Sequence, residues 1–153
     1  YMSALDVALL ALDVFLIVMF GTALSSIVGH FVSSQGQISA VGTIVSAGYG
    51  FICGAYMPIS QFSPTIQKII SFLPGTYGTS LTRNHSMNGA LSEMEKSGIP
   101  SEAVETMRDV VDCNVYFFGD KVSVSTMYII LGATTLALVA IYVFLNMKKR
   151  FSK

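Results

Sequence analysis

The stretch GYGFICGAYMPISQFSPTIQKIISFLPGTYGTSLTR, residues 48–83, decides how the rest of the chain is arranged. It completes a long apolar segment at Pro58, and two more prolines, Pro64 and Pro74, follow before the sequence becomes polar. Proline lacks a backbone donor and disfavours helix at the residue before it, so these prolines divide the stretch into separate elements. We expect an apolar helix, a short helix and a polar region, in that order.

The segment between the last two prolines predicts a short helix over residues 63–73. Ser63 suits the N-cap and Pro64 suits the first helical position. Apolar residues at helical spacing form one stripe, made of Ile66, Ile69, Ile70 and Leu73. At about 1.5 Å per residue this helix reaches about 15 Å, which is half the apolar thickness of a bilayer. We expect it to enter the membrane edge or to lie along it.

The composition is typical of an integral membrane protein. The chain is 52% hydrophobic and 12% charged, with a mean hydropathy of +0.63, and soluble domains carry about twice that charged fraction. The net charge of zero gives no argument for a nucleic-acid partner. Cys53 and Cys113 form no disulfide framework and lack metal-ligand spacing, so no metal site is predicted. We expect Cys53 to be a buried small apolar residue.

Three apolar runs are long enough to cross a bilayer, at about residues 7–29, 38–57 and 123–147. Most charged residues lie instead in residues 75–121, which we expect to be a small water-facing segment. Within it, Ser101 predicts the N-cap of an amphipathic helix that ends near Asp112.

Basic residues decide the predicted orientation. Lys148, Lys149, Arg150 and Lys153 follow the last apolar run at once, and positive residues beside a span stay on the cytoplasmic side. The C-terminus is therefore predicted inside, with residues 75–121 and Tyr1 outside. The predicted fold class is an all-α integral membrane protein with three transmembrane helices, short re-entrant or interfacial helices and a small extracellular helical segment. Because the chain opens at Tyr1, we expect it to be part of a longer protein.

Asp13 is the only ionisable group well inside an apolar run. A charge at the bilayer centre costs about 2.5–3.5 kcal/mol on insertion scales, so such a residue faces a cavity or a partner. Two interpretations stay open: a contact for substrate or a proton, or a structural hydrogen bond to Ser39, Thr43 or Ser46 on a neighbouring helix. Asp6, on the same face, is expected to be solvated.

Aromatic side chains gather at the outer end of the second apolar run. They either anchor the membrane interface or form an outer gate and path for an amphipathic substrate. Broken backbone at membrane depth survives only where protein or a cavity shelters it, which favours the gate. The candidate residues for the substrate path and outer gate are Asp13, Tyr56, Phe72, Pro74 and Tyr77.

Small residues recur every four positions on the second apolar run, at Gly42, Ser46, Gly50 and Gly54. Such spacing lets helix backbones approach closely in lipid. The pattern fits a helix-packing or dimer interface, and it fits contacts within one subunit equally well.

The motifs GAYMPIS, SPTIQKIISFLPGTYGTSLTR and DCNVYFFGDKVS, placed between apolar spans, resemble the C-terminal half of ABC-2-type transporter permeases. In that family a G-x-x-x-P turn ends the fifth span, and a P-x-T-Y element leads to an arginine. A segment with Asp and Phe-Phe-Gly then precedes the sixth span. The matching positions here are Gly54 to Pro58, Pro74 to Tyr77, Arg83, Asp112 and Phe117 to Gly119.

The resemblance implies that residues 1–153 are the C-terminal part of an ABC-2-type transmembrane domain in the cell membrane. Such permeases pair as homodimers or heterodimers, and a cytosolic ABC ATPase powers them to export drugs, lipids or similar amphipathic substrates by alternating access. The permease itself holds no cofactor, because ATP binds the partner subunit. The first three spans and the coupling segment of the family have no counterpart here, so this chain alone is not expected to couple to an ATPase.

Two other classes of protein were weighed. A membrane-anchored interaction or assembly protein, acting through its extracellular segment, would show an exposed apolar groove on residues 75–121. An intramembrane enzyme is disfavoured, because the spans offer one carboxylate and no second catalytic group, and the sequence has no Walker A, nucleophile-elbow or HExxH motif. The chain is therefore predicted not to be an enzyme, and nothing in it selects one substrate.

Overall fold

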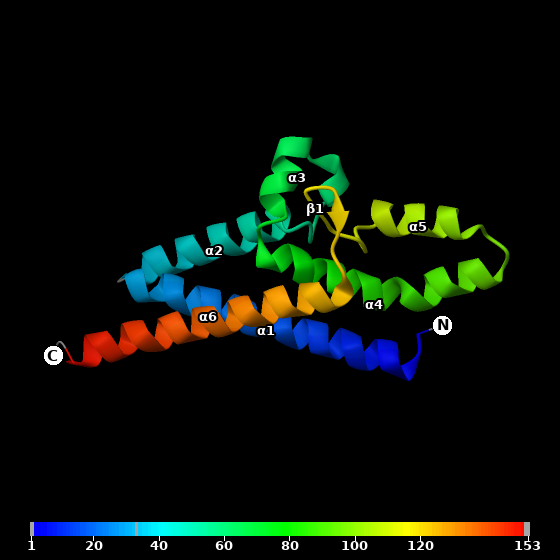
Figure 1. Ribbon diagram of the computed structural model, residues 1–153. Helices are drawn as coiled ribbons and strands as arrows, with labels where there is room; N and C mark the ends of the chain where they lie inside the picture. The colour runs from blue at the N-terminus through cyan, green and yellow to red at the C-terminus, as the bar shows by residue number, and fades with distance from the viewer. Residues whose placement is uncertain (1, 33, 152–153) are drawn as a thin grey trace.

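The computed structural model describes residues 2–32 and 34–151, which are mostly helical (Figure 1). The elements are α1 (Ala4–Phe31), α2 (Gln35–Ile52), the 3-10 turn η1 (Ile59–Gln61), α3 (Pro64–Ile70), α4 (Pro74–Lys96), α5 (Ser101–Val110), β1 (Tyr116–Phe117), β2 (Asp120–Lys121) and α6 (Val124–Phe151). The two strands form one short antiparallel hairpin, with Tyr116 opposite Lys121. The predicted helical architecture is confirmed.

Helices α1 and α6 are long and apolar enough to cross a membrane, by length and composition. They contain the predicted run 7–29 and all of the predicted run 123–147 except Ser123. Many of their large apolar side chains are exposed, including Leu5, Phe15, Val18, Ile129, Leu136 and Phe144. The remaining predicted run, residues 38–57, is helical only as far as Ile52, and α2 is not among the described helices that meet the same test.

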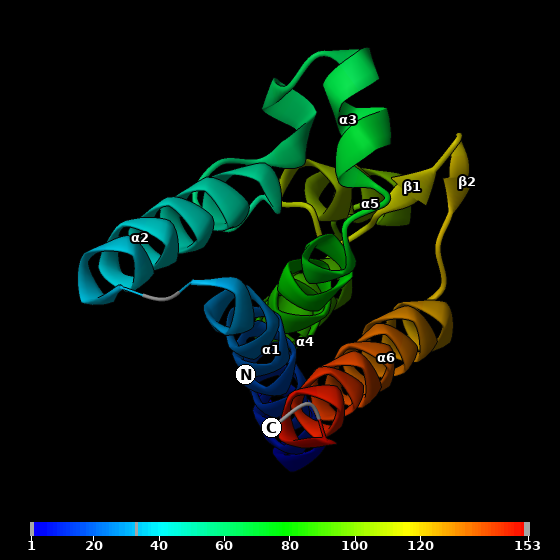
Figure 2. The same cartoon turned by 90° about the vertical axis from the view of Figure 1, so that its left-hand side faces the viewer.

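Helices α1, α4 and α6 pack together as a three-helix bundle, and α2 diverges from it (Figures 1 and 2). The bundle core contains Phe20, Tyr77, Leu81, Val115, Met127 and Leu131. The polar character of residues 75–121 predicts a water-facing segment. Instead, the first part of this segment forms α4, which lies between the two long apolar helices.

Two glycines let α4 approach its neighbours closely. A Cβ atom at Gly78 would lie 2.8 Å from Cγ1 of Ile17 on α1 and 3.5 Å from Cδ2 of Leu131 on α6. A Cβ atom at Gly75 would lie 2.5 Å from Cε1 of Tyr49 on α2. Since real Cβ atoms do not approach other atoms so closely, the start of α4 depends on glycine at both positions.

The short helix α3 is shorter than predicted. It begins with Pro64 at its first turn as expected, but Ser63 makes no side-chain capping bond, and the helix ends at Ile70 rather than Leu73. In Figure 2, α3 projects sideways from the end of α2, beside the hairpin.

The far end of α4 carries a second small core. Leu91 on α4, Val104 on α5 and Cys113 after α5 are buried together. Helix α5 begins at Ser101 with Pro100 at the N-cap, so the predicted N-cap at Ser101 is wrong by one residue, and the helix ends at Val110. Cys53 is 2% exposed, which confirms its predicted burial, and Cys113 is fully buried.

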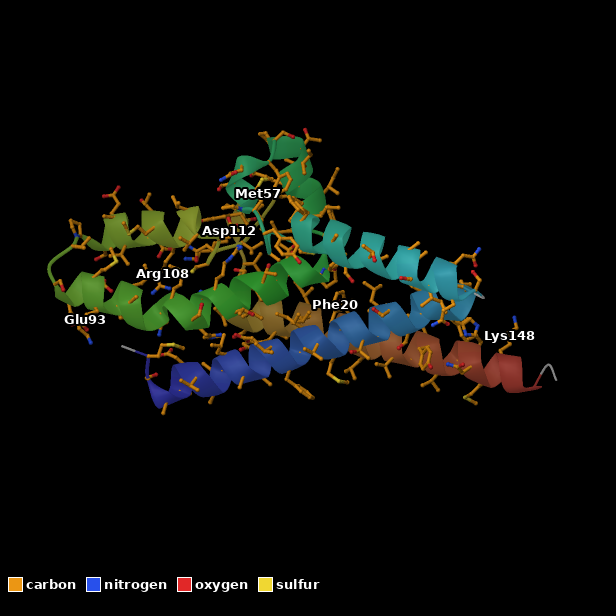
Figure 3. The ribbon with its side chains drawn as sticks, turned by 180° about the vertical axis from the view of Figure 1, so that it is seen from behind. Phe20, Met57, Glu93, Arg108, Asp112 and Lys148 are labelled. Atoms are coloured by element: carbon orange, nitrogen blue, oxygen red, sulfur yellow. The ribbon has the colours of Figure 1, made fainter. Side chains whose placement is uncertain are left out.

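Glu93 on α4 and Lys148 on α6 mark the two ends of the bundle. Figure 3 shows Phe20 between them. Tyr1 and Lys153, which entered the predicted orientation, lie outside the described residues, and so do the side chains of Lys149 and Arg150.

Candidate functional site

A buried polar cluster joins the three helices of the bundle. Asp13 on α1 has no exposed surface. Its Oδ2 atom lies 2.6 Å from Nδ1 of His85 on α4, and its Oδ1 atom accepts a hydrogen bond of 2.5 Å from the hydroxyl of Tyr128 on α6. The rings of His85 and Tyr128 stack with centroids 6.2 Å apart. The carboxylate of Asp13 therefore connects α1 to both α4 and α6.

The predicted partners of Asp13, namely Ser39, Thr43 and Ser46, are wrong. All three lie on α2, and α4 occupies the place beside α1 that α2 was expected to take. A charged carboxylate in an apolar bundle needs charged or hydrogen-bonded partners, and α4 and α6 supply them. In either charge state of the His85 ring, an Nδ1–H group can donate to Asp13.

A second polar contact lies nearer the start of α1. Asp6 is 6% exposed, closes a capping box with Ser3, and accepts a hydrogen bond of 2.9 Å from Nδ2 of Asn88. Oδ1 of Asn88 in turn accepts a bond of 3.5 Å from Arg108 on α5. The expectation that Asp6 is solvated is therefore wrong, since α4 covers it.

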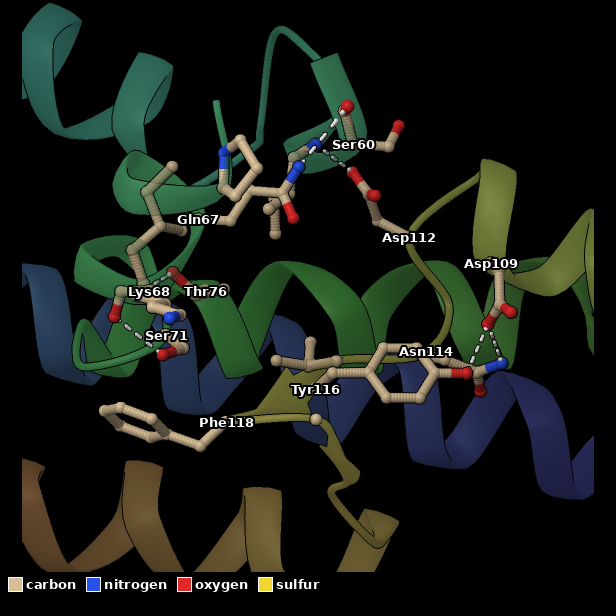
Figure 4. A pocket seen from close by; sticks show the side chains of 15 residues that line it. Ser60, Gln67, Lys68, Ser71, Thr76, Asp109, Asp112, Asn114, Tyr116 and Phe118 are labelled. Atoms are coloured by element: carbon tan, nitrogen blue, oxygen red, sulfur yellow. Dashed lines mark hydrogen bonds between the residues drawn. The ribbon is translucent and has the colours of Figure 1, made fainter. Parts of the chain in front are cut away.

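A cavity of about 520 Å³ lies outside the bundle, among η1, α3, the start of α4 and the chain between α5 and β2 (Figure 4). It is lined by Ile59, Ser60, Pro64, Gln67, Lys68, Ile70, Ser71, Thr76, Asp109, Asp112, Asn114, Val115, Tyr116, Phe118 and Gly119. We call it the outer cavity.

Asp112 holds the wall of the outer cavity together. It adopts φ +54° and accepts hydrogen bonds from the backbone N–H of Ile59 at 2.7 Å and from Arg83 at 3.0 Å. Arg83 also donates to the carbonyl of Gly54, so it ties the turn after α2 to the turn after α5. Burial raises the pKa of Asp112, while the Ile59 N–H and Arg83 oppose that rise.

Two further charges face the outer cavity. Asp109 accepts hydrogen bonds from neutral donors, Nδ2 of Asn114 at 2.7 Å and the hydroxyl of Tyr116 at 2.9 Å. The ion pairs formed among the described side chains include neither Asp109 nor Lys68.

The predicted gate residues occupy different environments. Tyr77 is 3% exposed in the bundle core, and its hydroxyl donates to the carbonyl of Ser71 at 2.5 Å. Phe72 is exposed beside the outer cavity, where it packs edge-on against Phe117 and Phe118. Tyr56 lies exposed on the surface after α2, and Pro74 begins α4. Their roles in a gate stay predictions.

The predicted small-residue stripe divides into two halves. The ring of Tyr56 covers Gly50, and Gly54 adopts φ +79° in the turn beside Ile59, so both serve the turn that follows α2. Gly42 has no described atom within 4 Å of a Cβ placed on it, and Ser46 is exposed. Gly42 also lines a small pocket between α1 and α2, and the role of this half of the stripe in a subunit interface stays a prediction.

Comparisons with known proteins return no match: no family model, no curated protein and no solved structure resembles the chain. Within residues 2–32 and 34–151, no group of three His, Cys, Asp or Glu residues is placed to hold a metal ion. The class of protein is therefore inferred from its motifs and from the arrangement described above.

Proposed function

We propose that the chain is the membrane-spanning permease portion of an ATP-driven ABC exporter, which moves an amphipathic substrate such as a drug or a lipid out of the cell by alternating access. Its partners are a cytosolic ABC ATPase, a second permease subunit and the lipid bilayer. ATP binds the ATPase, and the permease needs no cofactor of its own. The order of the motifs GAYMPIS, LPGTYGTSLTR and DCNVYFFGDKVS supports this class.

The observation that carries the membrane part of the proposal is the distribution of polarity in the bundle. Large apolar side chains of α1 and α6 face outward, whereas Asp13 and His85 are buried between helices. A soluble protein buries apolar groups and exposes charges, but a bilayer favours the reverse arrangement for its spanning helices. This distribution supports the proposal that lipid surrounds the bundle.

The proposed orientation follows from the ends of the bundle. The basic residues at the C-terminal end of α6 lie in the cytoplasm, and α5, the hairpin and the far end of α4 lie outside. Helix α4 then enters the bundle from the middle of the membrane and leaves on the outer side, while η1 and α3 lie near the outer surface.

The weak attachment of α2 suggests which parts move. Helix α4 meets α2 through the hydroxyl of Tyr49, which accepts from the backbone N–H of Gly75 at 3.2 Å, and through Thr79, which donates to the carbonyl of Cys53 at 2.8 Å. The bundle of α1, α4 and α6 can therefore rock as one unit against α2 with few contacts to break. In this mechanism α2, with Gly42 and Ser46, faces the second permease subunit.

The test measures the efflux of a substrate and the ATPase activity of the purified complex. The tagged protein is purified from its own cells in mild detergent, and the ATPase activity of the complex is measured. Efflux of a fluorescent amphiphile is then compared between cells with the native protein and cells that carry His85→Leu. The proposal expects a co-purified ABC ATPase and slower efflux in the variant. A purified protein without ATPase activity, from cells whose efflux does not change when its gene is removed, would overturn the proposal.

A second candidate function is a membrane-anchored interaction protein that acts through its extracellular segment. The observation in its favour is the exposed aromatic pair Phe117 and Phe118 on the hairpin. Replacing both by serine separates the candidates, because an interaction protein loses its partner at once while an exporter keeps its ATPase complex.

A further inference from the structure

The outer cavity combines a recess that opens to the surface, two separate charges and an apolar rim. We propose that it binds the headgroup of a zwitterionic phospholipid of the phosphoethanolamine type. The ammonium group contacts Asp109, the phosphate contacts Lys68, and the acyl chains leave over Phe72, Phe117 and Phe118. This inference requires the bundle to span the bilayer, but it does not require the chain to transport anything.

The dimensions suit a small polar headgroup. Ligand pockets in proteins have volumes of about 300–1,000 Å³, and the outer cavity, at about 520 Å³, lies in this range. Its lining contains hydrogen-bonding groups of Gln67, Ser71 and Asn114 as well as the apolar side chains of Ile59 and Ile70. The side-chain N–H and O–H groups of Gln67, Ser71 and Asn114 already donate within the protein, so these side chains offer oxygen acceptors to the ammonium group of a headgroup.

The charges select a ligand that carries both signs. Arg83 already neutralises Asp112 at 3.0 Å, so this carboxylate has no charge to offer. Asp109 has only neutral hydrogen-bond donors and Lys68 has no acidic partner among the described side chains, which leaves one negative and one positive group. Figure 4 shows Lys68 on one side of the cavity and Asp109 on the other. A purely anionic or purely cationic amphiphile would leave one of the two unmatched.

Tyr116 supports the proposed ammonium contact at Asp109. Its hydroxyl donates to Asp109 at 2.9 Å and its ring lies along the cavity (Figure 4). This bond holds the carboxylate of Asp109 in place at the cavity wall, where an ammonium group can reach it.

The apolar rim connects the cavity to the bilayer. Phe72 and Phe118 are about three-fifths exposed, and the rings of Phe72, Phe117 and Phe118 pack edge-on with centroids 4.9–5.9 Å apart. The hairpin turn places Phe118 at φ +52° and Gly119 at φ +102°, a geometry that suits asparagine better than a bulky aromatic residue. Since the hairpin directly precedes α6, the exposed rings lie where that helix enters the membrane, and lipid chains cover them.

The experiment compares short-chain lipids that differ only in headgroup charge. The full chain is purified in maltoside micelles, and binding is measured for dihexanoyl-phosphatidylethanolamine, dihexanoyl-phosphatidylglycerol and a dihexanoyl-trimethylammonium amphiphile. We expect the zwitterionic lipid to bind about tenfold more tightly than either singly charged probe, because one charge-assisted contact changes affinity by about that factor.

Two variants assign the two ends of the headgroup. Asp109→Asn should bring phosphatidylethanolamine to within about twofold of phosphatidylglycerol, whereas Lys68→Gln should bring it to within about twofold of the cationic probe. Glu95→Gln and Lys96→Gln, exposed at the far end of α4, are the matched controls and should bind as the wild type does. Lys68 is exposed, so its variant folds even if Asp109→Asn does not.

Three outcomes overturn the inference: no probe binds, phosphatidylglycerol binds as tightly as phosphatidylethanolamine, or Asp109→Asn and Lys68→Gln behave like their controls. Because binding is measured without transport, it can succeed while export fails. That combination would remove the exporter proposal and leave the lipid site standing.

Discussion

Helices α2 and α4 each take the place that the sequence predicts for the other. Apolar α2 lies beside the bundle, and the more polar α4 is part of it. Helix α2 is apolar over most of its length and carries no charged residue, yet it meets the bundle mainly at its C-terminal end. Helix α4 contains Arg83, His85 and Asn88, and it lies between α1 and α6. Apolar content therefore does not decide which helix enters this bundle.

The difference lies in what each helix offers to its neighbours. Lipid tails are as apolar as leucine, so an apolar face gains little by leaving lipid for another helix, whereas close packing and interhelical hydrogen bonds do favour association. Helix α4 has both, through Gly75, Gly78 and His85. On helix α2, Ser46 is exposed, and Gly42 lines a small pocket beside α1 without close packing.

The largest expected effect comes from breaking the contact that holds α4 in place. His85→Leu leaves the buried Asp13 with Tyr128 as its remaining partner and should lower the free energy of unfolding by about 3 kcal/mol. The measurement is unfolding in mixed micelles, followed by circular dichroism. His30→Leu, near the end of α1, is the control and should change stability by less than about 0.5 kcal/mol.

The double variant Asp13→Leu with His85→Leu tests the physical reason. Removing both partners leaves no unpaired buried charge, so most of the lost stability should return. If the double variant is less stable than His85→Leu alone, the cluster is not the reason that α4 stays in the bundle.

A glycine pair compares the two helices directly. Gly78→Ala places a methyl group 2.8 Å from Ile17, whose β-branched side chain is stiff in a helix, and should cost about 1–2 kcal/mol. Gly42→Ala meets no described atom within 4 Å and should leave the monomer unchanged. Equal losses of stability in the two variants would mean that α2 is packed as tightly as α4.

Two tyrosines give a smaller contrast. Tyr77→Phe removes the bond to the Ser71 carbonyl and leaves a buried acceptor, so it should cost about 1 kcal/mol. Tyr56→Phe, on an exposed ring after α2, should have no effect on stability. Thermal unfolding in micelles distinguishes the two, and a stable Tyr77→Phe variant would show that the loop before α4 is held by other contacts.

The smallest expected effect concerns the contact between α5 and β2. The side chain of Lys121 bonds Glu105 and is the main reason that the pKa of Glu105 is lowered from its ordinary value of 4.5. A carboxyl group whose pKa is lower in the folded state stabilises the fold above its ordinary pKa, and this stability is lost as pH falls through the folded pKa.

The wild type should therefore lose about 0.5 kcal/mol more than Glu105→Gln between neutral pH and about pH 3, a small value because the pair is about half exposed. Lys121→Gln should flatten the profile in the same way. Unfolding curves of the three proteins across this range provide the measurement, and parallel curves would contradict the expectation.

The sequence predicts the parts of the fold that depend on local chemistry. Long apolar runs predict α1 and α6, and Pro64 marks the start of α3, whereas the sequence does not predict the helix α4 that begins at Pro74. Burial of Cys53 follows from the apolar run around it. These features need no knowledge of which segments meet in space.

The position of α4 could not be predicted in the same way, because it depends on contacts between distant residues. Asp13 and His85 lie far apart in the chain, and only packing shows that they meet. A signal was present: Asp6 and Asp13 share a face of one helix, and His85 and Asn88 share a face three residues apart. Antiparallel pairing of those faces places each acid beside a polar partner.

The burial of both cysteines makes the protein convenient for labelling. Cys53 and Cys113 are inaccessible in the folded state, and burial raises the pKa of the Cys113 thiol, so reagents that attack thiolates have no ready target. The chain also lacks tryptophan. A single cysteine or tryptophan introduced at an exposed site, such as Glu95 or Lys148, would then give the only label or fluorescence signal. No native residue would have to be replaced first. Impermeant thiol reagents at those two positions read directly which end of the bundle faces the cell exterior.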